Sequence, residues 1–250
     1  MKISVVIPVL NERGSLPATI AALRARRGTA GSVVSENGDS QIMISEIIVS
    51  DGGSTDGTAD WLREQTDITL VNSARGKGPQ LNAGAARATG DVLLFLHADS
   101  ALSQAALDAL YSALSDAQLS GGAFYLRFAE SRPRSLRLVA WGINLRAWLR
   151  GSATGDQGIF VRRDVFQSIG GAPDWPLFED VELVRRIKQA GKFTVLRTPL
   201  TVSGRRYIEH GVLRTALLIY SLRFAYWLGV PPQRLKNWFR DAHQPGKDKL

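Results

Sequence analysis

The first half of the chain alternates between short apolar runs and segments with helical spacing. The apolar runs are residues 3–9, 46–50, 68–71 and 91–96, and the helical segments are residues 16–26, 58–64, 80–88 and 104–114. Strands that are apolar throughout are typical of a sheet covered on both faces, and helices are the usual crossovers between parallel strands. The alternation therefore predicts an α/β protein with a mostly parallel central sheet flanked by helices.

The second half is less regular but continues the pattern. Residues 122–128, 158–161 and 193–196 are expected to be strands, and residues 136–149 and 181–189 helices. Residues 28–42, which are rich in Gly, Ser and Asn, are expected to form an exposed insertion. We expect a catalytic domain over residues 1–205 and a basic, aromatic helical extension over residues 206–250.

The extension has a helix candidate with a one-sided apolar stripe. Residues 212–228 place Leu213, Ala216, Leu217, Tyr220, Phe224, Trp227 and Leu228 at three- and four-residue steps. Three interpretations stay open: the stripe docks on the catalytic domain, it forms a dimer seam, or it lies on an anionic membrane. Docking or dimerisation is the first expectation, so residues 211–240 are a candidate homodimer or peripheral membrane contact.

Composition removes several chemistries and locates the charge. The chain has no cysteine and only three histidines, which excludes disulfides and thiolate chemistry and disfavours a multi-His metal site. Residues 185–250 hold 14 basic and 3 acidic residues, a net charge of +11, whereas residues 1–184 hold 17 basic and 20 acidic residues, a net charge of −3. The basic excess, which suggests an anionic partner, therefore belongs to the C-terminal quarter.

No targeting segment is evident. Residues 3–10 are short, contain Pro8 and lack a small-residue cleavage site, and residues 212–230 are interrupted by Arg214 and Arg223. We therefore expect a cytoplasmic protein, with peripheral contact at the inner face of the membrane as the alternative that the tail leaves open.

Polar residues gather after the predicted strands, where open parallel sheets bind ligands. They include Asn11-Glu12, the turn from Asp51 to Thr58, Arg75-Gly76-Lys77-Gly78, and His97-Ala98-Asp99. Neither the dinucleotide fingerprint nor the Walker-type phosphate loop is present.

Each of these signals has a structural alternative. The carboxylate of Asp51 is suited either to a hydrogen bond from a base or ribose or to the local turn. The carboxylate of Asp99 is suited either to a divalent metal shared with phosphates or to a helix cap. Arg75 and Lys77 suit a diphosphate or a solvated turn. Glu179 and Asp180 suit a general base or a favourable helix start. Asp156 and Gln157 suit an acceptor contact or a turn.

The order of these motifs resembles the family-2 glycosyltransferases of GT-A fold. The resemblance rests on residues 5–12, residues 51–58, Lys77-Gly78 with residues 81–84, residues 90–99, and Glu179-Asp180, and it covers about residues 2–200. It implies a nucleotide-sugar-dependent, hexosyltransferase-like enzyme and leaves the sugar and the acceptor open.

The resemblance also implies roles for single residues. Pro8 and Glu12 would line the nucleoside pocket, Asp51 would accept from a base that is usually uracil, and Lys77 or Arg75 would lie near the base or phosphates. Asp99 would bind Mn²⁺ or Mg²⁺, and Asp180 would deprotonate the acceptor beside Glu179. Asp156 and Gln157 would face the acceptor or the donor sugar. The remaining donor-side residues are Asn11, Gly53, His97 and Ala98, and Arg205 and Arg206 would close over the diphosphate.

One position departs from the family pattern. The usual D-x-D is here His97-Ala98-Asp99, which keeps the carboxylate that normally binds metal and replaces the first Asp. A neutral imidazole at that position would contact the ribose or join the metal.

The sequence thus predicts an inverting, metal-assisted transfer from a nucleoside-diphosphate sugar, with a UDP-sugar favoured, to an acceptor hydroxyl. The acceptor is lipid-linked if the tail meets a membrane. Two alternatives remain. A sugar nucleotidyltransferase would want a glycine-rich basic loop after the first strand, which residues 11–14 supply poorly. A non-enzymatic membrane or nucleic-acid binder is suggested by charge alone, and we expect no nucleic acid partner.

Overall fold

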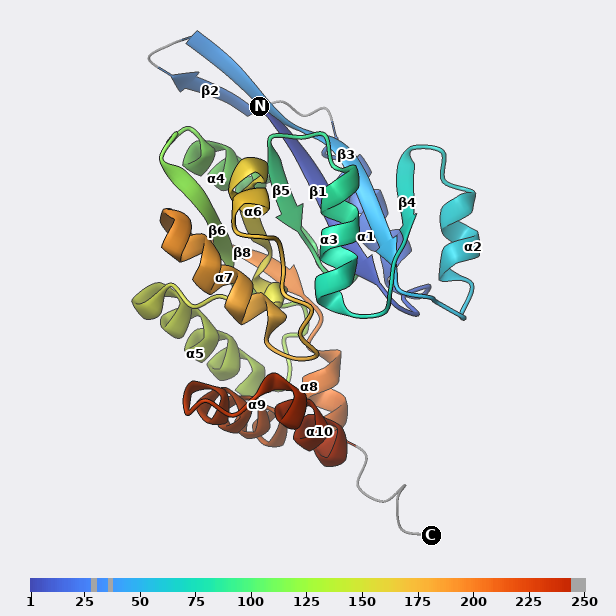
Figure 1. Cartoon of the computed structure of the whole chain (residues 1–250), viewed down its shortest axis with the longest axis vertical. Helices are drawn as coiled ribbons and strands as arrows, with labels where there is room; N and C mark the ends of the chain where they lie inside the picture. Colours follow the sequence, from blue (N-terminus) through green and yellow to red (C-terminus); the bar gives the residue numbers. More distant parts are fainter. Residues whose placement is uncertain (28–30, 36–37, 244–250) are drawn as a thin grey trace.

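A computed structural model describes residues 1–27, 31–35 and 38–243 of the chain. Its centre is an eight-stranded sheet with helices on both faces (Figure 1). The strands are β1 (Lys2–Val9), β2 (Gly31–Ser35), β3 (Gly38–Asp51), β4 (Ile68–Asn72), β5 (Val92–Phe95), β6 (Leu119–Phe128), β7 (Ile159–Arg162) and β8 (Lys192–Val202). The predicted α/β architecture is confirmed.

The sheet follows the order β2-β3-β1-β5-β7-β6-β8, and β4 pairs with β3. The pairs β1–β3, β1–β5, β3–β4 and β6–β8 are parallel, as expected. Strand β7 runs antiparallel to both β5 and β6, so the second half of the sheet is mixed. The carboxyl ends of β1, β3 and β5 therefore share one edge, and the loops that follow them meet there.

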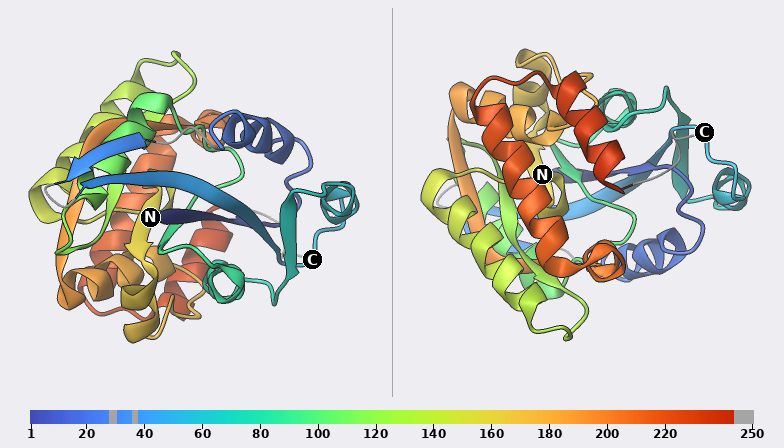
Figure 2. Two further views of the ribbon diagram at one scale, coloured as in Figure 1. Left: turned by 90° about the horizontal axis from the view of Figure 1, so that it is seen from above. Right: turned by 90° about the horizontal axis from the view of Figure 1, so that it is seen from below.

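The two faces of the sheet bury two separate hydrophobic clusters. Ile3, Val5 and Ile7 of β1 face one cluster and Val6 faces the other, because successive side chains of a strand point to opposite faces. Helices α1 (Leu16–Arg24), α4 (Gln104–Leu114) and α5 (Ser135–Arg150) cover the first face. Helices α3 (Lys77–Arg87), α6 (Arg163–Ser168) and α7 (Glu179–Ala190) cover the second. Figure 2 shows α1 and α3 on opposite sides of β1 and β3.

Helix α3 packs unusually close to the sheet at Gly84. A Cβ at this position would lie 2.4 Å from Cγ1 of Val6 and 2.6 Å from the hydroxyl of Ser50. Glycine is therefore required for this approach, which sets the position of Lys77 at the start of the same helix.

Residues 28–42, which were expected to form an exposed insertion, contain two paired strands. Residues 28–30 and 36–37 lie outside the described residues, but β2 and the first part of β3 form an antiparallel hairpin. The two strands pair through backbone hydrogen bonds, and the segment is largely polar. Because the expectation relied on runs of apolar residues, it did not detect these strands.

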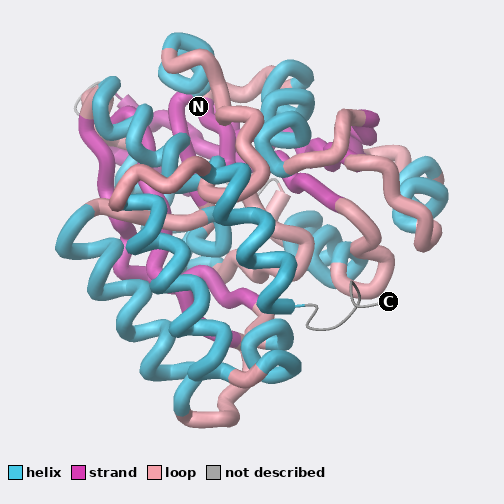
Figure 3. Tube along the Cα trace, turned by 60° about the horizontal axis from the view of Figure 1, so that its bottom comes forward, coloured by secondary structure: helices cyan, strands magenta, loops and turns pink. Residues whose placement is uncertain are grey.

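Three helices follow the sheet: α8 (Arg205–His210), α9 (Val212–Trp227) and α10 (Pro232–His243). They lie across the end of the sheet toward which β1, β3 and β5 point, as Figures 1, 2 and 3 show. Leu222 of α9 and Leu235 of α10 pack against Phe178, which precedes α7. No helix in the described parts of the chain is long and apolar enough to cross a membrane.

The apolar stripe of α9 does not dock as expected. Leu217 is 68% exposed and Trp227 is 77% exposed, and Leu213, Phe224 and Leu228 are also exposed. The residues of α9 that are buried are instead Val212, Thr215, Ala216 and Leu222. Docking on the catalytic domain was therefore the wrong expectation for most of the stripe. A second apolar side of the helix, interrupted by Thr215 and Arg223, therefore faces the protein.

Candidate active site

Two loops at the carboxyl edge of the sheet are joined by hydrogen bonds. They are residues 10–15 after β1 and residues 52–58 after β3, which we call the donor-side loops. Three consecutive backbone amides of the first loop donate to side chains of the second: Asn11 to Ser54 at 2.9 Å, Glu12 to Thr58 at 3.0 Å, and Arg13 to Asp56 at 3.0 Å. The amide of Thr55 donates in return to Oδ1 of Asn11 at 2.8 Å. The polar residues that the sequence grouped after two strands therefore form one framework.

Asp51 supports this framework from the end of β3. Its buried carboxylate accepts hydrogen bonds from the amide of Gly53 at 3.1 Å and the amide of Ser54 at 3.0 Å, and also from the Ser54 hydroxyl. Gly53 adopts a φ of 92°, which favours glycine. The turn chemistry that the sequence left open for Asp51 is therefore present, and the carboxylate lies at the edge where a nucleoside would be held.

Lys77, His97 and Asp180 meet around Gly155. The Lys77 ammonium lies 3.4 Å from Nε2 of His97. The amide of Gly155, in the short helix η1 (Gly155–Gln157), donates to Oδ2 of Asp180 at 2.7 Å, and a Cβ on Gly155 would lie 2.9 Å from Nε2 of His97. The amide of Val181 donates to Oδ1 of Asp180 at 2.7 Å. Backbone groups thus fix the Asp180 carboxylate at the start of α7.

The ionisable groups of this region perturb one another. Burial, together with the neighbouring Asp180 charge, raises the pKa of Glu179 to about 7. Burial and the Lys77 ammonium lower the pKa of His97 to about 3, so its imidazole is neutral, as the sequence analysis assumed. Burial opposes ionisation of Asp156, but His97 and Lys77 hold the pKa of its carboxyl below its usual range.

Asp99 follows β5 on the same edge, and its side chain is exposed. Desolvation by the surrounding loops, and then the nearby Glu12 carboxylate, raise the pKa of Asp99. Local negative charge is therefore in excess, which a bound cation would relieve, and carboxylate oxygens are ligands that Mg²⁺ and Mn²⁺ favour. Within the described residues, no group of three His, Asp or Glu side chains forms a ready-made metal site.

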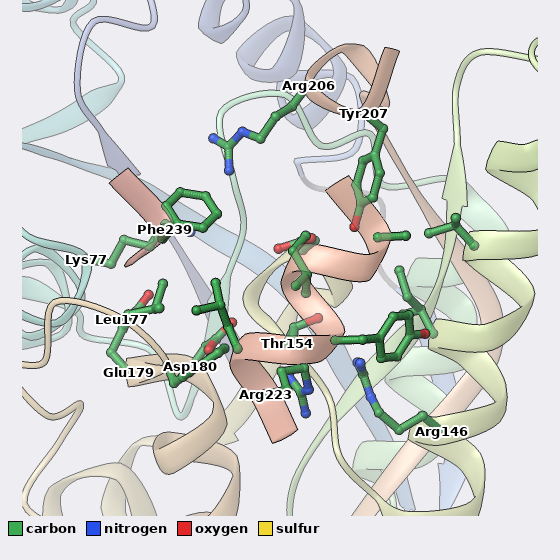
Figure 4. Close-up of a pocket in the computed structure, with 18 residues that line it drawn as sticks. Lys77, Arg146, Thr154, Leu177, Glu179, Asp180, Arg206, Tyr207, Arg223 and Phe239 are labelled. Atoms are coloured by element: carbon green, nitrogen blue, oxygen red, sulfur yellow. The ribbon is translucent and has the colours of Figure 1, made fainter. Parts of the chain in front are cut away.

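A cavity of about 150 Å³ extends from this cluster toward the C-terminal helices (Figure 4). Lys77, Asp156, Glu179, Asp180 and Arg206 line its polar side. Its other walls come from α5, α8, α9 and α10, with Ile143, Tyr207, Ile219 and Phe239 among the lining residues. A smaller cavity of about 20 Å³ lies behind it and is lined by Pro8, Lys77, His97, Glu179 and Asp180.

The other predicted residues have different surroundings. Gln157 is fully buried, and its amide nitrogen donates to the carbonyl of Phe124 at 2.9 Å, so its side chain holds the loop before β7. Ala98 is buried, and its carbonyl accepts from the hydroxyl of Thr19 at 2.7 Å. Arg75 is exposed on the turn before α3. Arg205 forms an ion pair with Glu209 at 3.7 Å, whereas Arg206 lines the cavity.

Several residues of the site carried no signal in the sequence. Gly155, Tyr207, Arg146 and Arg223 all lie at or in the cavity wall. Arg146 and Arg223 stand inside amphipathic helices, where an arginine is ordinarily read as part of a solvated face. Only their burial distinguishes them, and burial depends on how α5 and α9 pack.

The fold is that of the GT-A glycosyltransferases, as comparison with solved structures shows. The mannosyltransferase PcManGT from Pyrobaculum calidifontis, solved with GDP-Man and Mn²⁺, aligns with a TM-score of 0.61 and 20% identity over 97% of this chain and 70% of its own. Glucosyl-3-phosphoglycerate synthase from Mycobacterium tuberculosis, solved with Mn²⁺, UDP and phosphoglyceric acid, aligns with a TM-score of 0.56 and 20% identity over 87% of this chain and 76% of its own.

Residues 4–170 match the sequence family described as glycosyl transferase family 2, and the chain belongs to that family. Membership of this family favours a glycosyltransferase over the nucleotidyltransferase and the non-enzymatic alternatives. The probable glycosyltransferase YdaM of Bacillus subtilis is 28% identical over 58% of this chain and 40% of its own length. An undecaprenyl-phosphate 4-deoxy-4-formamido-L-arabinose transferase of Klebsiella pneumoniae is 33% identical over 39% of this chain and 29% of its own length. The chain thus spans less than half the length of these curated relatives.

Proposed function

We propose that this glycosyltransferase moves a sugar, with inversion, from a nucleoside-diphosphate sugar to an acceptor, and that Asp180 is the general base. The observation that carries the proposal is the position of the Asp180 carboxylate. It is fixed by the amides of Gly155 and Val181 and lines the cavity that reaches from Lys77 to the C-terminal helices. A base held between donor and acceptor can take the acceptor proton while the anomeric carbon is attacked from the opposite side to the leaving group.

A nucleoside diphosphate, with UDP favoured, would lie along the donor-side loops. Support comes from the buried Asp51 carboxylate on the nucleoside side and from the Lys77 and Arg206 cations near the cavity. Solved relatives of the same fold carry UDP or GDP-Man, which agrees with a donor of this class. Lys77 and Arg206 would stabilise the negative charge of the departing diphosphate.

Asp99 would hold a Mn²⁺ or Mg²⁺ ion together with the diphosphate oxygens, and the excess negative charge around it fits this role. When bound, such a metal supplies Lewis-acid stabilisation of the leaving group. His97 is better placed for the donor than for the metal, because its Nε2 faces the Lys77 ammonium.

The acceptor side points toward a membrane. Helices α5 and α9 pack side by side and expose Leu138, Trp141, Trp148 and Leu149 from α5, with Leu213, Leu217, Phe224 and Trp227 from α9. We call these eight side chains the aromatic face. Its four side chains from α9 belong to the part of the chain that carries the basic excess, a combination that suits the surface of an anionic bilayer, whereas the four from α5 lie in the part with a net charge of −3. We propose peripheral contact with the inner face of the membrane and a lipid-linked acceptor; the curated relative from Klebsiella pneumoniae is named for undecaprenyl-phosphate.

The test is a panel of nucleotide sugars, scored by thermal shift with and without Mn²⁺ and then by donor hydrolysis and transfer. We expect Asp180→Asn to bind the donor normally and to lose about 10²–10⁴-fold in turnover. We expect Asp99→Ala to lose metal-dependent donor binding. Undiminished turnover of Asp180→Asn, or unchanged metal dependence of Asp99→Ala, would refute the corresponding assignment. Exposed Asp60→Asn on α2 (Thr58–Arg63) is the control for a lost surface charge.

A further inference from the structure

Two arginines from different helices meet in the wall of the cavity. Arg146 comes from α5 and Arg223 from α9, and their guanidinium groups point toward one another (Figure 4). We call them the arginine pair. Both line the cavity that Asp180 also lines, and both line a second, larger cavity of about 830 Å³, which we call the outer groove. The pair therefore lies where the candidate active site and this groove adjoin.

The arginine pair is only partly satisfied within the protein. Nη2 of Arg223 donates to the hydroxyl of Ser152 at 2.9 Å, and Nε of Arg146 donates to the carbonyl of Ser152 at 3.2 Å. Nη2 of Arg146 and Nη1 of Arg223, however, are buried and have no hydrogen-bond partner. Among the described residues, no carboxylate forms an ion pair with either guanidinium.

Such an arrangement is costly unless something else binds to it. Burial, together with the charge of Arg223, lowers the pKa of Arg146 to about 10, and burial lowers the pKa of Arg223 as well. Buried donors are nearly always paired in native proteins, and two neighbouring cations repel each other. Asp156 and Asp180 offset part of this charge at a distance but do not pair with the guanidinium groups. The unpaired N–H groups therefore indicate that the arginines bind an anion that is not part of the protein.

The chemistry of the surroundings narrows the class of anion. Guanidinium groups match the oxygens of phosphate in a two-pronged geometry, so a pair of them suits the phosphate group of a phosphate monoester. The outer groove lacks Lys77 and Arg206, the cations assigned to the donor diphosphate, so an occupant that enters through this groove is better matched to the acceptor. Val181, Phe224, Tyr226 and Trp227 line the groove, and Phe224 and Trp227 continue into the aromatic face. An apolar chain could follow this path to the surface.

We propose that the arginine pair binds a phosphate group of the acceptor, which is a phosphate monoester on an apolar chain. This inference rests on the proposed function, because it uses Asp180 to define the acceptor side of the cavity. The phosphate lies between the two guanidinium groups, and the apolar chain runs outward along Phe224 and Trp227. The acceptor is thereby held with its polar end beside Asp180. The hydroxyl of the singly charged phosphate gives its proton to Asp180 as its oxygen bonds to the anomeric carbon and the bond from that carbon to the nucleoside diphosphate breaks.

The proposal is tested by calorimetric titration of the full chain with three probes. Decyl phosphate carries both the phosphate and the chain, glycerol phosphate carries the phosphate alone, and decanol carries the chain alone. We expect saturable binding of decyl phosphate, weaker binding of glycerol phosphate and no binding of decanol. If glycerol phosphate bound as tightly as decyl phosphate, the phosphate site would be supported and the assignment of an apolar chain to the acceptor would be refuted.

The arginines are then changed one at a time. Each of Arg146→Gln and Arg223→Gln should weaken decyl phosphate at least about tenfold, since a charge-assisted hydrogen bond is lost. Arg223→Lys, which keeps the charge but not the forked geometry, should fall in between and covers the case in which a glutamine variant does not fold. Arg137→Gln, an exposed change on the same helix, should bind as the unchanged protein does.

Binding of UDP with Mn²⁺ and donor hydrolysis are measured in the same variants. Both should persist when the arginines are changed, so a failure of the donor assignment is recognised separately. Equal affinity of the unchanged protein and both glutamine variants for decyl phosphate, or no binding of either phosphate probe, would overturn the inference.

Discussion

The backbone amide of Gly155 donates a 2.7 Å hydrogen bond to the carboxylate of Asp180, and this bond ties the loop before β7 to the start of α7. The same glycine lies against the His97 imidazole, so donor-side and acceptor-side groups meet at a residue that has no side chain. The geometry of the site therefore depends on glycine at position 155 as well as on the Asp180 carboxylate.

Gly155→Ala should therefore impair catalysis without unfolding the protein. Its Cβ would lie 2.9 Å from Nε2 of His97, so the imidazole or the loop must shift, whereas its distance of 3.5 Å from Oδ2 of Asp180 is ordinary contact. Displacements of this size near a reacting centre should lower turnover at least about tenfold. Steady-state transfer and thermal unfolding are the measurements. Gly14→Ala, where a Cβ meets nothing within 4 Å, is the matched control, and equal turnover of the two variants would contradict the expectation.

Glu179→Gln should change both the pH profile and the stability. Because the pKa of Glu179 is raised to about 7, its carboxyl is mostly protonated below that pH in the folded protein and mostly protonated only below about 4.3 when unfolded. The favourable contribution of the neutral form is complete below the unfolded value and is lost as the pH rises through about 7. The variant should thus be more stable than the parent at pH 8, by on the order of 1–3 kcal/mol, and about equal at pH 4.

Turnover gives the second part of this test. If the ionised Glu179 assists Asp180, the acid limb of the rate profile near pH 7 should disappear in Glu179→Gln. Urea unfolding at pH 4 and 8, with rates between pH 5 and 9, measures both effects. If the variant were instead less stable than the parent at pH 8, the ionised Glu179 carboxylate would be stabilised by an interaction that is not among the contacts described above.

Glu46→Gln should destabilise the edge of the sheet opposite to the site. Partial burial opposes ionisation of this carboxylate, but hydrogen bonds from the Ser4 hydroxyl at 2.6 Å and the Thr89 amide at 2.7 Å outweigh it and lower its pKa. Its contribution is present above the unfolded pKa and is lost as the pH falls through the lower folded value. The variant should lose about 1–2 kcal/mol at pH 7 and much less near pH 3, measured by denaturant unfolding. A pH-independent loss would assign the effect to shape alone.

Substitutions in the aromatic face should weaken membrane binding and leave the fold intact. Leu217 is 68% exposed and Trp227 is 77% exposed, so Leu217→Ser and Trp227→Ser remove apolar surface that the protein itself hardly uses. Each should reduce co-sedimentation with anionic vesicles about tenfold. Ile208→Ser, a change of a 43% exposed apolar side chain on α8 outside the aromatic face, is the control. Unchanged pelleting together with a loss of dimer on gel filtration would make the face a contact between two copies.

The sequence predicted the parts of this protein that apolar periodicity and strand-end motifs report. The central strands and most helices lie within a few residues of their expected bounds, because a buried strand or an amphipathic helix must show its burial in its pattern. Strand β2 was missed because its hairpin is polar. The orientation of α9 was missed because both sides of the helix carry apolar residues: it buries Val212 and Leu222 and exposes Trp227.

The residues of the candidate site likewise fall into those that the sequence pattern predicted and those that it did not. The placement of Asp51, Lys77 and Asp99 on one edge follows from parallel strands that end together, whereas Asp180 reaches this edge at the start of α7, after the antiparallel strand β7. Gly155 and the arginine pair do not follow from any local pattern, because each acquires its surroundings from a segment far away in the chain. Gln157 shows the opposite error, since a polar residue beside a motif turned out to serve the core.

The donor-side loops have a consequence for the thermodynamics of substrate capture. Their three adjacent amides, on Asn11, Glu12 and Arg13, are already bound to side chains of the neighbouring loop. The conformational entropy of these loops is therefore lost during folding and does not have to be lost again when a nucleotide arrives. This half of the site meets its ligand as a nearly rigid surface, so binding there should depend little on temperature-driven ordering of the chain.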